Sequence, residues 1–339
     1  MKRAIISFLF LMVAVAGKVA AQDPQFSQYY SAPLYLNPAF AGSTDHQRAA
    51  AIHRTQWPAL PQAFTTYAFS YDLNLKPVNS GVGILISTDK AGTAGLRSTQ
   101  IGLQYAYKIQ MRDRWVLSPG LSFGYGLRDI NIDKLLFGDQ LEFGSRDDVP
   151  PSLDPTVKNI GGTSFFDFGL GFLLYNKNVW LGASAYHVNE PNYSMLGNTS
   201  TIPMKVTLHG GFRFHLNQGV RKADRVASLA PSFLYKSQGK FDQLDVGMQF
   251  QYFPIMVGFW YRGIPIQQNV RDNADQDAIA FIFGLMFDQL NINYSYDMTV
   301  SELGADIGGA HEVSIIFEWT SRDMRKVKRK EKFIPCPTF

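Results

Sequence analysis

One segment of the chain has acidic residues at the spacing that begins a calcium-binding loop. Asp129, Asn131 and Asp133 alternate like the first three ligands of an EF-hand loop. The glycine that such a loop needs next is replaced by Lys134, and the terminal glutamate falls on Gln140. Because the two most diagnostic positions do not fit, the sequence predicts no calcium site here.

The other candidates for chemistry are isolated side chains and glycine pairs. His209 and His215, on one face of a strand, would lie roughly 20 Å apart and could not share a metal. The Gly-x-Gly pairs at 81–83 and 169–171 lack the third glycine and the following helix of a dinucleotide-binding loop. The single cysteine, Cys336, can form neither an intramolecular disulfide nor a zinc site. We therefore predict a protein that is not an enzyme and that uses no metal or cofactor.

The elements that would position any site are about fourteen strands within residues 45–319, recognised by alternating apolar and polar residues. The alternation is clear at 99–109, 244–252 and 313–319. Successive side chains of a strand point to opposite faces, so each segment has one apolar and one polar face. Several segments have about nine to twelve residues, the length that crosses a bilayer when tilted, whereas soluble strands usually have five or six.

The lengths of the connections also alternate along the chain. Connections after even-numbered strands are short: 74–79, 110–113, 176–178, 217–223, 253–254 and 288. The long connections follow odd-numbered strands: 128–163, 188–202, 262–276 and 298–308. A soluble β-sandwich has no reason to keep this parity. We predict an all-β fold, a single closed antiparallel transmembrane β-barrel of about 14 strands, with long extracellular loops and short periplasmic turns.

The two ends of the chain differ in composition from the barrel. Residues 1–21 have the basic start, short apolar stretch and small-residue cleavage site of a signal peptide, with cleavage expected before Gln22. Residues 321–339 form a basic tail, which we place in the periplasm. The net charge of +4 is concentrated in these two ends, so it gives no support to nucleic-acid binding.

Specific residues of the mature chain resemble those of one known family. The motif positions are Asp23, Pro24, Phe26, Ser27, Gln28, Tyr29, Asn37, Pro38, Ala39, Gly42, Gln56, Trp57, Cys336 and Pro337. Together they resemble the PorP/SprF family of type IX secretion system outer-membrane proteins of Bacteroidetes. The resemblance covers essentially the whole mature chain, and its N-terminal part is the specific one.

The resemblance implies a function that the strand pattern alone does not. It implies a non-enzymatic outer-membrane component that works with the type IX secretion system. Its partners would be the secretion components and a large secreted surface protein with a C-terminal sorting domain, such as an adhesin in gliding species. The alternative is a porin or a channel for hydrophobic substrates. Under either interpretation the protein is integral to the outer membrane, in contact with its lipid, and both termini are expected in the periplasm.

Two segments outside the barrel allow alternative interpretations. Residues 22–44 could be a loose periplasmic leader or a plug packed in the lumen against glycine-rich strands; their many Tyr and Phe residues favour ordered contact. Residue pairs such as Ala32-Pro33 argue against a helix there. The tail could be a solvated stop or a docking element. Its candidate docking residues are Arg325, Lys326, Lys328, Arg329, Phe333 and Phe339.

Overall fold

The structure is a computed structural model. It describes residues 22–44, 47–60, 63–92, 95–111, 114–132, 135–140, 152–158, 160–216, 227–268, 274–300 and 308–319.

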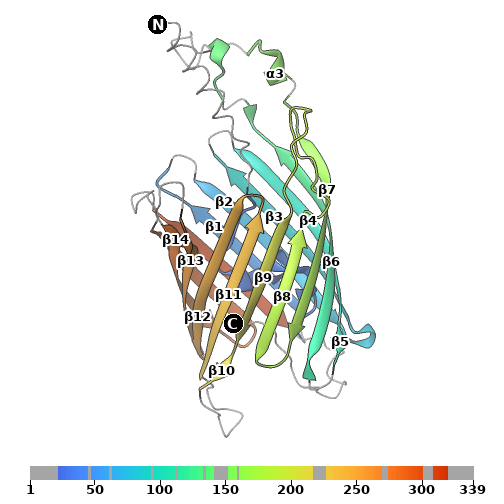
Figure 1. The fold of residues 1–339 in the computed structure, drawn as a ribbon, viewed down its shortest axis with the longest axis vertical. Coiled ribbons are helices and arrows are strands. Elements are labelled where there is room, and N and C mark those ends of the chain that lie inside the picture. Colours follow the sequence, from blue (N-terminus) through green and yellow to red (C-terminus); the bar gives the residue numbers. More distant parts are fainter. Residues whose placement is uncertain are drawn as a thin grey trace.

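In these residues fourteen long antiparallel strands close into one barrel, which confirms the predicted fold (Figure 1). They are β1 (Gln47–Gln56), β2 (Phe64–Leu75), β3 (Ser80–Ala91), β4 (Leu96–Tyr107), β6 (Val116–Asp129), β7 (Thr163–Tyr175), β8 (Val179–Tyr186), β9 (Lys205–Phe212), β11 (Ala227–Gln238), β12 (Phe241–Tyr252), β13 (Ile255–Gln268), β14 (Ala274–Met286), β15 (Leu290–Thr299) and β16 (Ala310–Trp319). Two short strands, β5 (Ile109–Gln110) and β10 (Phe214–His215), continue β4 and β9. The barrel closes because β16 pairs with β1 and β9 pairs with β11.

The outer face of the barrel carries the large apolar side chains. Ile101 and Val246 are 41% and 46% exposed, and Phe123 contacts Phe168 edge to face with ring centres 5.7 Å apart. An outward apolar band is what lipid requires of an outer-membrane barrel. Among the described residues, none of the helices is both long and apolar enough to cross a membrane.

The two ends of the barrel differ in the lengths of their connections. The short-turn end includes the connections from β7 to β8 and from β12 to β13, and the long-loop end includes those from β6 to β7 and from β8 to β9. The turn predicted at 217–223 lies outside the described residues.

The loop predicted at 262–276 is wrong in its extent. Arg262 pairs with Ala278 inside the ladder, β13 continues to Gln268, and β14 already begins at Ala274. The register shifts between Arg262 and Gly263, where φ is +143°. A bulge of this kind lets two strands remain paired where the alternating pattern is interrupted.

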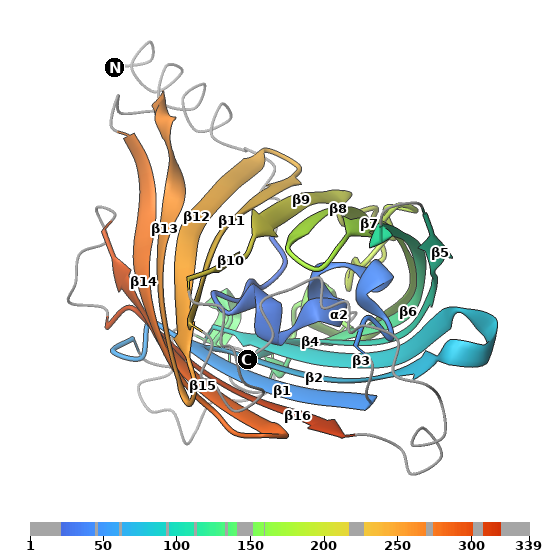
Figure 2. The ribbon, with the colours of Figure 1, turned by 90° about the horizontal axis from the view of Figure 1, so that it is seen from below.

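Residues 22–44 lie inside the ring of strands (Figure 2). They form three short helical turns: η1 (Tyr29–Ser31), α2 (Pro33–Leu36) and η2 (Pro38–Phe40). Short helices elsewhere are η3 (Lys76–Val78), η6 (Gly138–Gln140) and α3 (Pro155–Lys158).

The expectation of no helix in the N-terminal segment is wrong in detail. Proline at the first helical position has no N–H to leave unpaired and has a suitable φ, so Pro33 and Pro38 begin helical turns. The residue before Pro38 is extended, as expected before proline: Asn37 has φ −159° and ψ 124°.

Candidate functional site

The candidate site is the luminal plug, defined as residues 23–44, together with the barrel wall that holds it. Its apolar centre is fully buried: Leu34 and Phe40 are 0% exposed. The segment enters the lumen at the long-loop end and reaches β1 at the short-turn end. The prediction from the sequence was that both termini lie in the periplasm. The structure shows that Asp23 contacts Lys205 and Gln238, at the long-loop end.

Glycines in the wall let the plug backbone approach the strands. A Cβ atom added to Gly81 would lie 2.0 Å from the carbonyl oxygen of Ala41. A Cβ atom added to Gly120 would lie 2.4 Å from the backbone nitrogen of Ala39. No side chain fits at either distance, so these glycines mark the close backbone approach that their presence in strands suggested.

Asn37 anchors the middle of the plug to β7 and β8. Its amide nitrogen donates to the carbonyl oxygens of Phe172 and Ala183, each at 3.1 Å. Its side-chain oxygen accepts from the Ala39 N–H at 2.9 Å, and a Cβ atom on Gly171 would lie 2.0 Å from that oxygen. One amide therefore caps η2 and joins the plug to two strands.

The two histidines considered for a shared metal site lie in different environments. His209 is buried in the lumen, where its ring stacks on Phe40 with centres 5.4 Å apart. His215 lies in β10 and is exposed. No group of three metal-ligating side chains occurs among the described residues.

The first position of the candidate calcium loop has a partner in the barrel wall. Asp129 pairs with Arg97 across the exposed rim at 2.8 Å. Asp133 and Lys134 lie outside the described residues.

At the short-turn end a buried ion pair holds the last residues of the plug. Arg48 Nε lies 2.9 Å from Asp72 Oδ1, and both side chains are almost completely buried. The other oxygen of Asp72 accepts from the Gly42 N–H at 2.8 Å, and Lys108 donates to the Gly42 carbonyl oxygen.

Glu312 of β16 binds two consecutive backbone N–H groups of the plug. Its carboxylate accepts from Ser27 at 2.9 Å and from Gln28 at 2.7 Å. The same carboxylate pairs with Arg54 of β1 at 3.1 Å. Glu312 is 0% exposed, so this arrangement satisfies a charge that burial would otherwise make very unfavourable.

The Ser27 hydroxyl group forms hydrogen bonds with three charged side chains. It donates to Asp297 Oδ2 at 2.5 Å and accepts from Arg54 at 3.0 Å and from Arg262 at 2.7 Å. Asp297 also pairs directly with Arg54 at 2.8 Å and with Arg262 at 3.1 Å. Three strands and the plug therefore share one buried network.

Asp23 and His187 connect the start of the plug to the long-loop end. His187, which follows β8, lies 2.9 Å from Asp23 through Nε2 and 2.9 Å from Asp167 through Nδ1. Burial alone would lower the pKa of His187, but the two carboxylates raise it to about 9. Burial would raise the pKa of Asp23, but Lys205 and His187 outweigh it and lower that pKa well below its ordinary value. The histidine is therefore a cation at neutral pH.

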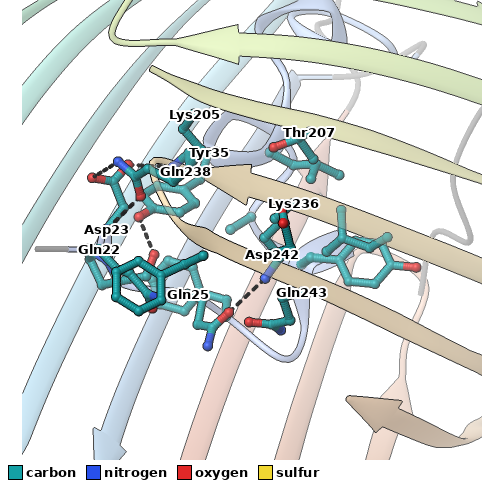
Figure 3. A pocket seen from close by; sticks show the side chains of 17 residues that line it. Gln22, Asp23, Gln25, Tyr35, Lys205, Thr207, Lys236, Gln238, Asp242 and Gln243 are labelled. Carbon is teal, nitrogen blue, oxygen red and sulfur yellow. Dashed lines mark hydrogen bonds and ion pairs between the residues drawn. The ribbon is translucent and has the colours of Figure 1, made fainter. Parts of the chain in front are cut away.

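Two cavities of about 360 and 390 Å³ share residues 22–25 as part of their walls. Figure 3 shows the first, in which Lys236 donates to Gln25 at 2.9 Å and Lys205 pairs with Asp23 at 2.6 Å. The second is lined by Gln56 and Trp57 and extends towards β6. We call the second one the outer cavity.

Most residues chosen from the motif lie on the plug and contact the wall. Tyr29 donates to Ser232 and packs against Trp260, with ring centres 5.1 Å apart. Phe26 packs edge to face on Tyr35, whose hydroxyl group donates to the Pro24 carbonyl oxygen at 2.5 Å. Cys336, Pro337 and the six candidate docking residues of the tail lie outside the described residues.

The wall partners of the plug were not identified from the sequence. Glu312, Asp297, Arg54 and Arg262 are charged residues on the polar faces of membrane-crossing strands. Ionisable residues within membrane-crossing segments are rare and usually functional. Their presence in these strands could therefore have identified them as candidate partners.

The sequence comparison decides the family. A family model described as type IX secretion system membrane protein PorP/SprF matches residues 18–317. The chain belongs to the PorP/SprF family. Like the family, it is a membrane protein of the type IX secretion system, located in the outer membrane. Among curated proteins, none matches this PorP/SprF chain.

Solved structures similar to this PorP/SprF protein are outer-membrane barrels of low identity. The Pseudomonas putida toluene transporter TodX has 10% identity and a TM-score of 0.46, with 84% of this chain and 93% of TodX covered. The monoaromatic hydrocarbon channel CymD has 11% identity and a TM-score of 0.47, with 89% and 95% covered. BamA from Haemophilus ducreyi has 9% identity and a TM-score of 0.40, with 81% and 70% covered.

Proposed function

We propose that this protein is a plugged, non-enzymatic component of the type IX secretion system that helps to secrete a large partner and retain it at the cell surface. The partner would carry a C-terminal sorting domain, as an adhesin does in gliding species. The plug is the observation that carries the proposal, because it occupies lumen that an open porin would leave to water.

The plug is bound along its whole length. Its contacts run from Asp23 at the long-loop end, through Ser27 and Asn37, to Gly42 at the short-turn end. Several of these contacts are buried ion pairs or charge-assisted hydrogen bonds, which are costly to break. The protein would therefore act through its surfaces rather than by passive conduction.

The orientation of the barrel follows the length of its connections. We place the long loops outside the cell and the short turns in the periplasm, as in other bacterial barrels. The basic tail, residues 321–339, would then begin in the periplasm and is proposed as a docking element for the secretion machinery or the partner.

Surface retention tests this function. Cells lacking the protein should release a sorting-domain protein into the medium, and the wild-type gene should return it to the cell surface. A variant lacking residues 332–339 should assemble normally, judged by heat-modifiable gel mobility, yet release the same protein. Unchanged retention in cells that lack the whole protein would contradict the proposal.

A further inference from the structure

The outer cavity has a row of polar side chains across its floor. The cross-strand register places Arg54 opposite Thr66, Thr66 opposite Asp89, Asp89 opposite Ser98, and Ser98 opposite Arg128. All five residues line the cavity. One row of the sheet therefore carries charges of both signs over five adjacent strands.

The Arg54 end of this row is already occupied by the plug. Arg54 pairs with Glu312 and Asp297 and donates to Ser27. Within the described part of the chain, the charges farther along the row have no such partners, so they are the part available to a ligand.

Asp89 and Arg128 lack ionic partners among the described residues. Asp89 accepts a hydrogen bond from Thr66 at 2.6 Å and forms no ion pair there. Arg128 Nε is buried without a hydrogen-bond partner in the described part of the chain, and its guanidinium lies 4.2 Å from the ring centre of Tyr193. Because they are two strands apart, their backbones are separated by roughly 10 Å, too far for a direct pair to be expected.

The cavity around these two charges has aromatic walls. Trp57, Phe64, Phe165 and Tyr193 line the cavity, whose volume is about 390 Å³. This volume and this mixture of apolar walls with a few polar groups are typical of ligand sites. A phosphate or another simple anion would suit Arg128 but would be repelled by Asp89.

We propose that the outer cavity binds an extended peptide segment of the secreted partner. A basic side chain of the peptide would pair with Asp89 and an acidic one with Arg128, while the residue between them packs against the aromatic wall. Side chains two residues apart on an extended peptide project from one face about 7 Å apart, and flexible basic and acidic side chains cover the remaining distance. The identity of the peptide's source rests on the proposed function, whereas the peptide chemistry rests on the cavity.

A blocked pentapeptide, Gly-Lys-Phe-Glu-Gly, is a suitable probe for the purified full-length protein in detergent. Titration calorimetry should show saturable binding to the wild type. Asp89→Asn, which can keep the Thr66 hydrogen bond, and Arg128→Gln should each weaken binding at least tenfold, because each removes a charge-assisted contact. Arg97→Gln is the matched control, since Arg97 lies on β4 in an exposed pair with Asp129 at the same rim; it should bind like the wild type.

Three results would overturn the inference. The first is that the wild type shows no saturable binding. The second is that the Asp89 and Arg128 variants bind like the control while keeping native heat-modifiable mobility. The third is that inorganic phosphate binds the cavity and binds more tightly to Asp89→Asn, which would make it an anion site. None of these results depends on secretion, because the purified protein needs no partner; a failure of surface retention in cells would instead count against the proposed function alone.

Discussion

Replacing Glu312 by alanine should release the plug around Ser27 and Gln28, while the part from Asn37 to Gly42 should stay in place. The change removes the acceptor of the Ser27 and Gln28 N–H groups and one of the two ionic partners of Arg54. Breaking a buried charge pair by removing one partner typically costs about 3–5 kcal/mol. The lower figure applies here, because Arg54 keeps Asp297 at 2.8 Å.

Amide hydrogen exchange measures this opening directly. A cost of about 3 kcal/mol corresponds to roughly 100-fold faster exchange of the two amides, since each 1.4 kcal/mol is a factor of ten. Amides near Asn37 and Gly42 should keep their protection, because their contacts are separate. Glu190→Gln, at an exposed position after β8, is the control and should change nothing. Unchanged exchange at Ser27 and Gln28 in the alanine variant would refute the assigned role of Glu312.

Three further predictions test other parts of the account. Because the folded-state pKa of His187 is raised to about 9, its stabilisation of the Asp23 contact is complete below about pH 6.5 and is lost as pH rises through 9. The exchange protection of the first plug amides, relative to the intrinsic rate at each pH, should therefore fall around pH 9, and His187→Gln should remove that fall. Gly120→Ala should reduce the yield of folded barrel on heat-modifiable gels, because its Cβ atom would lie 2.4 Å from the plug backbone, whereas Gly102→Ala has 3.6 Å and should fold normally. Val246→Arg should cost about 2–4 kcal/mol in urea unfolding from lipid vesicles if the residue faces the bilayer midplane, and an unchanged midpoint would place it elsewhere.

The barrel could be predicted from the sequence because each strand has a local pattern of alternating apolar and polar residues. Alternation along each strand identified the faces, and loop parity identified the closed architecture. The boundaries of β13 and β14 were missed because these strands remain paired beyond the segment with a clear alternating pattern. A bulge at Gly263 allowed this pairing, and bulges leave little trace in a single sequence.

The plug was only partly predictable. Its aromatic content and the glycines of the wall correctly suggested close packing inside the lumen. The hydrogen bonds and ion pairs that hold the plug could not be predicted. Ser27 and Glu312, for example, are 285 residues apart in the sequence, and no local pattern indicates that they meet. The helical turns at Pro33 and Pro38 were missed because proline restricts the residue before it while favouring a helix start after it.

The central claim is that the plug closes the lumen, and conductance across a planar bilayer tests it most directly. The purified wild-type protein should insert without a steady ion current, and removal of residues 25–36 should produce one if the barrel remains folded by heat-modifiable mobility. A steady current through the wild type, equal to that of the deletion variant, would contradict the account and favour a channel.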